Sequence, residues 1–395
     1  MQIAPIHQKF QVSFSYTVQF TNGLFRPDNL LLREAITQDG GEGPHKLFFV
    51  VDSGVHEAHP HLLEAISEYT QAHAPVLNLI TTPVVITGGE SCKNDPALVD
   101  QLLEAVHLHG IDRHSYMVAV GGGALLDMVG YVASVAHRGI RHIRIPTTVL
   151  SQNDSGIGVK NSVNAFGKKN FLGNFAPPNA VLNDFNFLTT LSDRDWRAGI
   201  SEAIKVSLIK DAAFFRFIQQ NAEKLAQRDM PAMQYLIFRC AEMHLQHIAG
   251  GDPFEQGSSR PLDFGHWSAH KLEQLSNYEI RHGEAVSLGI ALDSVYSHLT
   301  GKLSAPELEQ ILAVIRTLGF DLYVPELDQH LEDANHPNSL LHGLQEFREH
   351  LGGKLTIMLL IQIGEGVEVN TMDNATVVAA VRMLQQYQNQ TAPVQ

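Results

Sequence analysis

The stretch Tyr116-Met117-Val118-Ala119-Val120-Gly121-Gly122-Gly123-Ala124-Leu125-Leu126-Asp127 places a short apolar run directly before three glycines and the start of a helical pattern. Such a run is typical of a strand buried on both faces of a parallel sheet. Glycines allow a ligand to approach the backbone, and a helix N-terminus favours negative charge, so this turn suits a pyrophosphate. The stretch is not G-x-G-x-x-G, because Leu126 occupies the place of the last glycine, and a plain tight turn is the alternative.

Similar runs occur on both sides of this stretch. Other apolar or β-branched segments end at Gly, Pro or Asp turns: residues 47–51, 84–86 and 143–145. Helical patterns separate them, as in residues 96–109, and strands that alternate with helices predict a parallel α/β sheet. Residues 12–20 alternate apolar and polar side chains before Asn22-Gly23, which predicts a half-buried strand and a turn suited to a hairpin.

After about residue 188 the pattern changes to helical periodicity. Apolar residues recur at helical spacing, with few β-branched runs, in residues 212–227, 231–248, 285–299, 305–318 and 374–387. Residues 355–361 are the one late strand candidate. A chain of 395 residues is too long for one ordinary core. We therefore expect an α/β domain with a parallel sheet over residues 1–187 and a mainly helical domain over residues 188–395.

The composition excludes several classes of protein. The chain is 44% hydrophobic and 18% charged, which is typical of a globular protein, and its net charge of −14 argues against a nucleic-acid or anionic membrane surface. It has only two cysteines, Cys92 and Cys240, so a reducing compartment is expected rather than a disulfide framework. No signal peptide and no apolar run of membrane-spanning length is visible, which predicts a cytoplasmic protein.

Three histidines form the most specific polar pattern. His266 and His270 are four residues apart without Pro or Gly between them, so they share one face of a helix, and His282 follows in a His-Gly-Glu sequence. Three convergent imidazoles suggest a metal site or an acid/base site, and satisfied core histidines are the alternative. The chain has 21 histidines, so we interpret its other close groups as surface residues: His56, His59 and His61, His107 and His109, and His244 and His247.

Charged residues elsewhere allow two interpretations each. Glu202 and Lys205 are three apart on an apolar helix, where the carboxylate pairs either with the lysine or with a divalent metal. The Gly-, Ser- and Asn-rich residues 154–170 contain three lysines, which suit a phosphate or a developing oxyanion but are also typical of a solvated loop. Asp52 ends a strand, where it either holds a ribose hydroxyl or caps a turn.

Together these segments resemble the sugar phosphate cyclase family, which includes 3-dehydroquinate synthase. The motifs follow the family's order from Asp52 to about Gly364: Gly-Gly-Glu-Ser-Cys-Lys (88–93), Gly-Gly-Gly-Ala-Leu-Leu-Asp (121–127), His-Arg-Gly (137–139), Pro-Thr-Thr (146–148), Asp-Ser-Gly-Ile-Gly-Val-Lys (154–160), Gly-Lys-Lys-Asn (167–170), Glu-Ala-Ile-Lys (202–205), Phe-Gly-His-Trp-Ser-Ala-His (264–270) and His-Gly-Glu (282–284). Iron-dependent alcohol and glycerol dehydrogenases share the architecture, but the lysine motifs and His-Arg-Gly favour the cyclases.

The resemblance implies a Rossmann-like N-terminal domain, bound NAD and one divalent metal ion, zinc or cobalt. The implied metal ligands are Glu202, His266 and His282, with His270 nearby as an acid/base or substrate contact. The implied NAD contacts are Asp52, Glu90, Lys93, Gly122, Gly123, Asp127, Thr147, Thr148, Asp154 and Lys160. The implied substrate contacts are Asp154, Lys160, Lys169, Asn170 and Lys205. The resemblance also implies a homodimer in which Arg138 reaches the substrate phosphate of the neighbouring subunit.

The implied reaction is that of a carbon–oxygen lyase. A substrate hydroxyl, polarised by the metal, loses a hydride to NAD, which acidifies the adjacent C–H and lets phosphate leave by elimination. The hydride then returns, the sugar ring opens, and an intramolecular aldol addition closes a carbocycle. NAD is regenerated, so the resemblance implies no net oxidation.

The chain departs from the 3-dehydroquinate branch where that branch binds a substrate carboxylate. The branch's Arg falls on Ser259, with Arg260 one place late, its Asn falls on Asp263, and a lysine falls on Leu245. Nearer the C-terminus, Phe347-Arg348-Glu349 replaces Asp-Lys-Lys. Fewer cations and the added carboxylates of Asp263 and Glu349 disfavour a carboxylate ligand by like-charge repulsion, whereas carboxylates readily accept hydrogen bonds from hydroxyls.

We therefore expect sedoheptulose 7-phosphate as substrate and a 2-epi-valiolone-type cyclitol as product, in cyclitol biosynthesis. Two alternatives stay open. Arg260 and Arg348 could restore carboxylate binding, which would make the chain a 3-dehydroquinate synthase acting on 3-deoxy-arabino-heptulosonate 7-phosphate. The other alternative is a metal- and NAD-dependent polyol or alcohol dehydrogenase.

Overall fold

The computed structural model describes residues 5–38, 40, 43–250, 253–254, 261–350 and 353–390. The chain divides into two compact units. The first is Met1–Ile145 with Val159–Asp184, and the second is Pro146–Gly158 with Phe185–Gln395. This division differs from the one expected at residues 187 and 188, because the segment Pro146–Gly158 clusters with the second unit.

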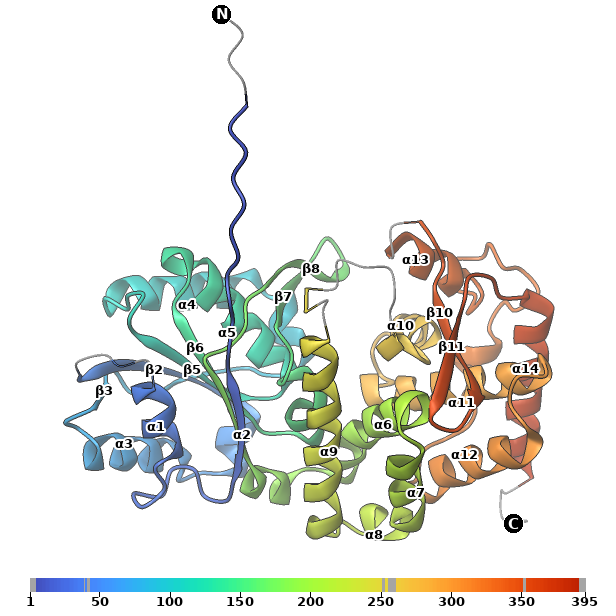
Figure 1. Ribbon diagram of the computed structural model, residues 1–395, viewed down its shortest axis with the longest axis horizontal. Helices are drawn as coiled ribbons and strands as arrows, with labels where there is room; N and C mark the ends of the chain where they lie inside the picture. Colours follow the sequence, from blue (N-terminus) through green and yellow to red (C-terminus); the bar gives the residue numbers. More distant parts are fainter. Residues whose placement is uncertain are drawn as a thin grey trace, which may run out of the picture. The chain divides into compact units, whose positions relative to one another are not determined.

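The first unit is an α/β structure on a seven-stranded sheet, whose order is β1-β9-β6-β5-β2-β3 with β4 also paired to β2 (Figure 1). Its strands are β1 (Thr17–Thr21), β2 (His45–Asp52), β3 (Leu77–Leu79), β4 (Val84–Ile86), β5 (Tyr116–Gly121), β6 (Arg141–Pro146) and β9 (Ala180–Asp184). Its helices are α1 (Leu31–Thr37), α2 (Ser53–Ala58), α3 (Leu62–Ala72), α4 (Pro96–Leu108) and α5 (Gly123–Val135). The pairings of β2 with β3, β4 and β5, and of β9 with β1 and β6, are all parallel, which confirms the expected α/β class.

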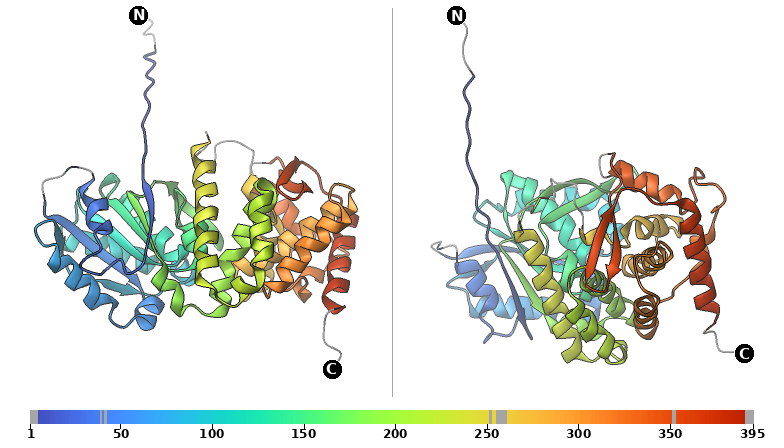
Figure 2. Two further views of the ribbon diagram at one scale, coloured as in Figure 1. Left: turned by 60° about the horizontal axis from the view of Figure 1, so that its bottom comes forward. Right: turned by 45° about the vertical axis from the view of Figure 1, so that its right-hand side comes forward.

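The N-terminal strand differs from its sequence prediction. β1 begins only at Thr17, and it lies at the sheet edge parallel to β9 instead of entering a hairpin. The backbone N–H groups of Gly23 and Leu24 donate to the Asp184 carboxylate at 3.0 and 2.7 Å. These bonds hold the Asn22-Gly23 turn against β9, so the hairpin prediction was wrong. Residues 5–16 precede β1 as an extended segment, which both views of Figure 2 show.

A separate antiparallel hairpin carries the predicted lysines. It consists of β7 (Lys160–Ala165) and β8 (Lys168–Phe175), joined by Phe166 and Gly167. Both turn residues have positive φ, 54° and 71°, which is the conformation that two-residue hairpins need to match the strand twist.

The second unit is mainly helical, as expected. Its helices are α6 (Asp193–Lys210), α7 (Ala212–Gln220), α8 (Ala222–Ala226), α9 (Met230–Ala249), α10 (His266–Leu275), α11 (His282–Leu299), α12 (Ala305–Thr317), α13 (His342–His350) and α14 (Asn374–Asn389). α11 is buried on nearly every side and packs against α6, α10, α12 and α14, which makes it the core helix (Figure 1). The expected late strand is β10 (Ile357–Gln362), and it pairs with β11 (Glu365–Val369), which the sequence pattern did not reveal. Among the described residues, no helix is long and apolar enough to cross a membrane.

Candidate active site

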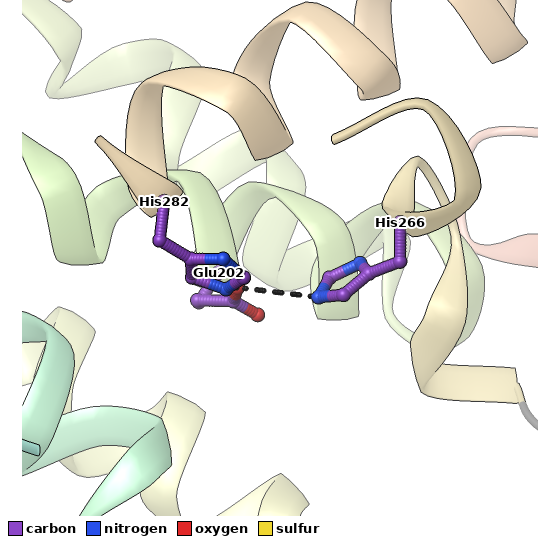
Figure 3. A group of neighbouring side chains, drawn as sticks. All are labelled: Glu202, His266 and His282. Carbon is purple, nitrogen blue, oxygen red and sulfur yellow. Dashed lines mark ion pairs between the residues drawn. The ribbon is translucent and has the colours of Figure 1, made fainter. Parts of the chain in front are cut away.

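Three helices of the second unit bring three potential metal ligands together. Glu202 lies on α6, and His266 and His282 are the first residues of α10 and α11. Figure 3 shows the three side chains pointing toward one another, and one ligand atom from each lies within 4.8 Å of the others. The sequence singled out these three residues, and the structure brings them to one point.

The hydrogen bond of His266 determines which of its nitrogens faces Glu202. Its Nδ1 lies 3.1 Å from the Phe264 carbonyl oxygen, which can only accept, so Nδ1 carries the hydrogen. Burial lowers the pKa of His266 well below its usual value, and Lys205 lowers it further, so the ring is neutral. Its Nε2 therefore presents a lone pair to Glu202 Oε1 at 3.7 Å. Two electron pairs that face each other at this distance favour a cation between them.

His282 is held from both sides by carboxylates. Its Nε2 lies 3.4 Å from Glu202 Oε1, and its Nδ1 lies 3.3 Å from Oε2 of the buried Glu273. Burial lowers the pKa of His282, but the two carboxylates outweigh burial and raise that pKa to about 9. An imidazole whose second nitrogen donates to a carboxylate is the usual form of a metal-ligating histidine. Glu273 was not predicted, although it lies seven residues after His266 and so two turns along the same helix.

The start of α11 is fixed against α6 by two contacts. A Cβ on Gly283 would lie 2.2 Å from the Ala198 carbonyl oxygen, so only glycine fits between the two backbones. Glu284 accepts a bond from the Arg281 backbone N–H at 3.0 Å, and its Oε1 accepts from Arg194 Nε at 2.6 Å. These contacts explain the His-Gly-Glu sequence, because the glycine and the glutamate set the distance of His282 from the helix that carries Glu202.

The charges around Glu202 suit a divalent cation. Glu202 is 1% exposed, and its ion-pair partner Lys205 is also buried. Burial raises the pKa of Glu202, but Lys205 and His282 outweigh burial and lower that pKa to about 2. The pKa of Lys205 is raised, because Glu202, Asp154 and Asp263 together outweigh its burial. Three carboxylates thus surround one ammonium, and Glu with two His suits either Zn²⁺ or Co²⁺.

His270 lies in the same cluster, as the spacing of four residues predicted. Its ring centroid is 5.6 Å from that of His266 and 6.3 Å from that of His282. The ring of the buried Phe347, on α13, lies 6.4 Å away on another side. Phe347 stands where the 3-dehydroquinate pattern has a charged residue, so this side of His270 is apolar.

Asp154 is paired with a histidine that the sequence interpretation placed on the surface. Asp154 lies in a short π-helical segment, Ser151–Ser155, and its Oδ1 is 2.9 Å from Nδ1 of His244 on α9. Burial and Glu202 raise the pKa of Asp154, but His244 and Lys205 outweigh them and lower it. The surface interpretation of His244 was therefore wrong, because its side chain is only 19% exposed and contacts an expected substrate residue.

In the first unit, Asp52 lies against the expected pyrophosphate turn. Its Oδ1 accepts from the Gly54 N–H at 2.8 Å and caps α2. A Cβ on Gly88 would lie 1.8 Å from Asp52 Oδ2, so the first glycine of the motif at 88–93 makes room for this carboxylate. Burial raises the pKa of Asp52, against hydrogen bonds from backbone N–H groups that include that of Gly122. Gly122 itself precedes α5, which begins at Gly123, so the turn does open a helix.

Lys93 is the centre of a polar network in the first unit. Its Nζ donates to Asp127 Oδ2 at 2.8 Å, to Ser162 Oγ at 3.1 Å and to Asn170 Oδ1 at 2.5 Å. Asn170 was expected at the substrate, and its side-chain oxygen lies among the residues expected to hold NAD. Ser162 was missed, because a serine inside a strand pattern gives no local signal of its partner 69 residues away.

The remaining expected contacts lie at turns and strand ends. Lys169 Nζ is 4.0 Å from Glu90 Oε1, and Lys160 is the exposed first residue of β7. Arg138 is exposed and has a φ of 64°, directly before Gly139 at 120°. A bulky residue in this left-handed conformation is strained, which is common at functional positions.

Thr147 and Thr148 begin the segment that clusters with the second unit. The Thr147 hydroxyl is buried and has no hydrogen-bond partner among the described residues, so it is available to a ligand. Thr148 Oγ1 lies 2.9 Å from Ser151 Oγ. Two positions at which the sequence departs from the carboxylate-binding pattern, Ser259 and Arg260, lie outside the described residues.

Sequence comparisons with known proteins identify one family. The family model for the 3-dehydroquinate synthase N-terminal domain matches residues 83–198, and the model for the C-terminal domain matches residues 199–337. The 3-dehydroquinate synthase of Pelobacter propionicus is 33% identical over 276 residues, which are 69% of this chain and 76% of that protein.

Solved structures extend the likeness over almost the whole chain. ValA, a 2-epi-5-epi-valiolone synthase from Streptomyces hygroscopicus subsp. jinggangensis 5008 with NAD⁺ and Zn²⁺ bound, matches with a TM-score of 0.84 and 30% identity, covering 97% of this chain and 100% of that one. A 2-deoxy-scyllo-inosose synthase shares the fold, with a TM-score of 0.74, 22% identity and coverage of 93% and 96%. The chain therefore belongs to the 3-dehydroquinate synthase family of sugar phosphate cyclases.

Proposed function

We propose that this chain binds NAD and one divalent metal ion and converts sedoheptulose 7-phosphate to a 2-epi-valiolone-type cyclitol, with loss of phosphate and no net redox change. The observation that carries the choice of substrate is the charge around Lys205. Asp154, Glu202 and Asp263 all act on that one ammonium. A substrate carboxylate placed beside Asp263 would be repelled by the negative charge of that side chain.

Two further observations support a substrate that carries hydroxyls in place of a carboxylate. The apolar Phe347 borders His270 where the 3-dehydroquinate pattern supplies a charged residue. ValA, named for a valiolone product, matches 97% of the chain. The 3-dehydroquinate synthase names of the family models and of the Pelobacter relative favour the competing substrate, 3-deoxy-arabino-heptulosonate 7-phosphate.

The residues then divide the work according to their chemistry. When bound, the metal polarises a substrate hydroxyl and NAD accepts a hydride from its carbon. Glu202, His266 and His282 hold the metal, and His270 exchanges a proton with the substrate beside them. Lys160, Lys169 and Lys205 stabilise the anion that develops as phosphate leaves.

Other residues bind the substrate and NAD. Asp154 and Asp263 accept hydrogen bonds from sugar hydroxyls. The NAD contacts are Asp52, Glu90, Lys93, Gly122, Gly123, Asp127, Thr147 and Thr148, with Asn170 bonded to Lys93. We also propose a cytoplasmic homodimer in which Arg138 binds the phosphate of the neighbouring subunit's substrate.

A two-substrate comparison tests this function. Purified protein with NAD and Zn²⁺ or Co²⁺ is incubated with each seven-carbon phosphate, and released phosphate is measured while mass spectrometry and NMR identify the product. We expect turnover of sedoheptulose 7-phosphate without net NADH. Turnover of only 3-deoxy-arabino-heptulosonate 7-phosphate would show a 3-dehydroquinate synthase. NADH accumulation from a polyol without phosphate release would show a dehydrogenase.

A substitution at Asp263 tests the charge argument separately. Asp263→Asn keeps the shape of the side chain but removes the negative charge that repels a carboxylate. We expect kcat/KM for sedoheptulose 7-phosphate to fall at least tenfold, with a relative gain for the carboxylate-bearing substrate. Glu346→Gln, on α13, is the control, and equal effects of the two variants on the substrate ratio would contradict the role of Asp263.

A further inference from the structure

We propose that Glu273 and Asp293 are positioning residues that fix the two imidazoles of the metal site through a reciprocal brace between α10 and α11. Each of these helices begins with an expected ligand, His266 or His282, and carries a buried carboxylate that acts on the other helix's ligand. The inference rests on the proposed metal site and concerns residues that no sequence pattern suggested.

The first half of the brace runs from α10 to α11. Glu273 is 3% exposed, and its Oε2 accepts from Nδ1 of His282 at 3.3 Å. This contact turns the ring so that Nε2 points at Glu202 Oε1, 3.4 Å away. A carboxylate behind a ligating histidine fixes both its orientation and the nitrogen that remains free for the metal.

The second half runs from α11 back to the start of α10. Asp293 is fully buried, and its two oxygens accept from the residues on either side of His266. Oδ2 accepts from the Gly265 backbone N–H at 3.0 Å, and Oδ1 accepts from Trp267 Nε1 at 2.9 Å. Asp293 therefore does not touch the imidazole itself but binds the backbone of the residue before it and the indole side chain of the residue after it.

The backbone before His266 lies very close to the backbone of α11. Gly265 has a φ of 76°, a conformation that favours glycine, and a Cβ there would lie 2.7 Å from the Ile290 backbone nitrogen. A Cβ on Gly289 would lie 2.0 Å from the Gly265 carbonyl oxygen. The turn before His266 thus packs directly onto α11 at Gly289, four residues before Asp293. This close packing restricts movement of the start of α10 relative to α11.

The energetics favour a specific role over incidental burial. Burying a carboxyl group costs free energy unless hydrogen bonds satisfy it. Glu273 contacts the potential metal ligand His282 directly, and Asp293 contacts the residues before and after His266. Each carboxyl group therefore reaches from its own helix to the start of the other. Losing such outer contacts typically weakens metal binding by about 10- to 100-fold.

Metal affinity, measured apart from catalysis, tests the brace. Metal-free full-length protein is titrated with Zn²⁺ against a chromophoric chelator, for the wild type and for E273A, E273Q, D293A and D293N. We expect the alanine variants to bind Zn²⁺ about 10- to 100-fold more weakly. E273Q should recover part of the loss, because an amide oxygen still accepts from His282. D293N should not, because two N–H donors face this side chain and its NH₂ group cannot accept from either.

Glu346→Gln is the matched control. Glu346 accepts from the buried Lys271 Nζ at 2.7 Å and so joins α10 to α13 without contacting a ligand. Its Zn²⁺ affinity should stay within about twofold of the wild type. The absorption spectrum of the Co²⁺ form should change in the brace variants and not in Glu346→Gln, because it reports ligand geometry.

The outcomes separate the two proposals. A wild type that binds no Zn²⁺ would refute the proposed metal site. A wild type that binds Zn²⁺ together with folded brace variants of equal affinity would refute the brace and leave the metal site standing. Should D293A not fold, the contrast between E273A, E273Q and Glu346→Gln still decides, with circular dichroism as the check on folding.

Discussion

Asp293 should make the stability of the second unit depend on pH in a defined direction. Burial raises the pKa of Asp293 to about 7, from the ordinary value of 3.8, against the hydrogen bonds from Trp267 and Gly265. Between these two values the folded chain keeps a proton that the unfolded chain has released. Stability must then fall as pH rises through this window and level off above pH 7. The contribution of Asp293 is therefore fully present only in acid.

The magnitude follows from the size of the window. One proton bound only by the folded state changes the free energy of unfolding by 1.36 kcal/mol per pH unit. From pH 5 to pH 7 this amounts to about 2 kcal/mol, because the folded carboxyl is already half ionised at pH 7, and this is a substantial part of the stability of a typical domain. Asp293→Asn cannot titrate, so its lost bonds cost the same at every pH. The difference in stability between the wild type and the variant isolates Asp293 from all other groups.

The assay can observe the second unit alone. The chain has two tryptophans, Trp196 and Trp267, and both belong to that unit. Urea titrations of metal-free protein, followed by tryptophan fluorescence at pH 5, 6, 7 and 8, give the unfolding free energy of each form. We expect the wild-type advantage over Asp293→Asn to shrink by about 2 kcal/mol from pH 5 to pH 7 and to level off by about pH 8. A constant difference across the whole range would refute the reasoning.

Three further predictions concern close contacts and the metal. Gly88→Ala should lower the melting temperature and weaken NAD binding at least tenfold in a fluorescence titration, because its Cβ would lie 1.8 Å from Asp52 Oδ2. Gly54→Ala, whose Cβ would lie 3.4 Å from Asp52 Oδ1, is the milder control, and equal effects of the two variants would contradict the prediction. Gly283→Ala should weaken Zn²⁺ binding at least tenfold in chelator competition, because its Cβ would lie 2.2 Å from the Ala198 oxygen and would push α11 from α6; unchanged affinity would count against that spacing. Removing the metal by dialysis should lower the thermal midpoint, since Zn²⁺ at 100 times its Kd adds about 2.7 kcal/mol; an unchanged midpoint in calorimetry would argue against the site.

The sequence predicted those parts of the fold that depend on neighbouring residues. The strand, glycine turn and helix at residues 116–135 were expected because the period and the turn residues lie within one short window. The hairpin at Asn22-Gly23 failed because its backbone is bound by Asp184, about 160 residues later. Nothing in the first 23 residues reveals that partner. β11 was missed for a related reason, since its residues become a strand only by pairing with β10.

The same limit applies to the site. The spacing of His266 and His270 and the His-Gly-Glu at His282 gave local signals, and Glu202 was one candidate for a metal ligand. The family resemblance joined Glu202, His266 and His282 into one ligand set. His244 looked like one of many histidines, because its partner Asp154 lies 90 residues away. Asp293 lay in an apolar helix pattern, and only the fold places it against Gly265, 28 residues earlier. A residue that positions a ligand from another helix has no fixed sequence separation from that ligand, so a single sequence does not reveal it.

The placement of both imidazoles at helix starts explains why so many carboxylates surround them. The N-terminus of a helix carries a partial positive charge, which repels a metal cation and favours the uncharged form of a nearby imidazole. A neutral imidazole offers the lone pair that a metal needs, but the helix ends alone would make the point unfavourable for the metal. Glu202, between the rings, and Glu273, behind one of them, supply the negative charge that reverses this field. These carboxylates thus offset the field of the two helix ends, and replacing Glu202 by a neutral residue should abolish Zn²⁺ binding even with both histidines in place.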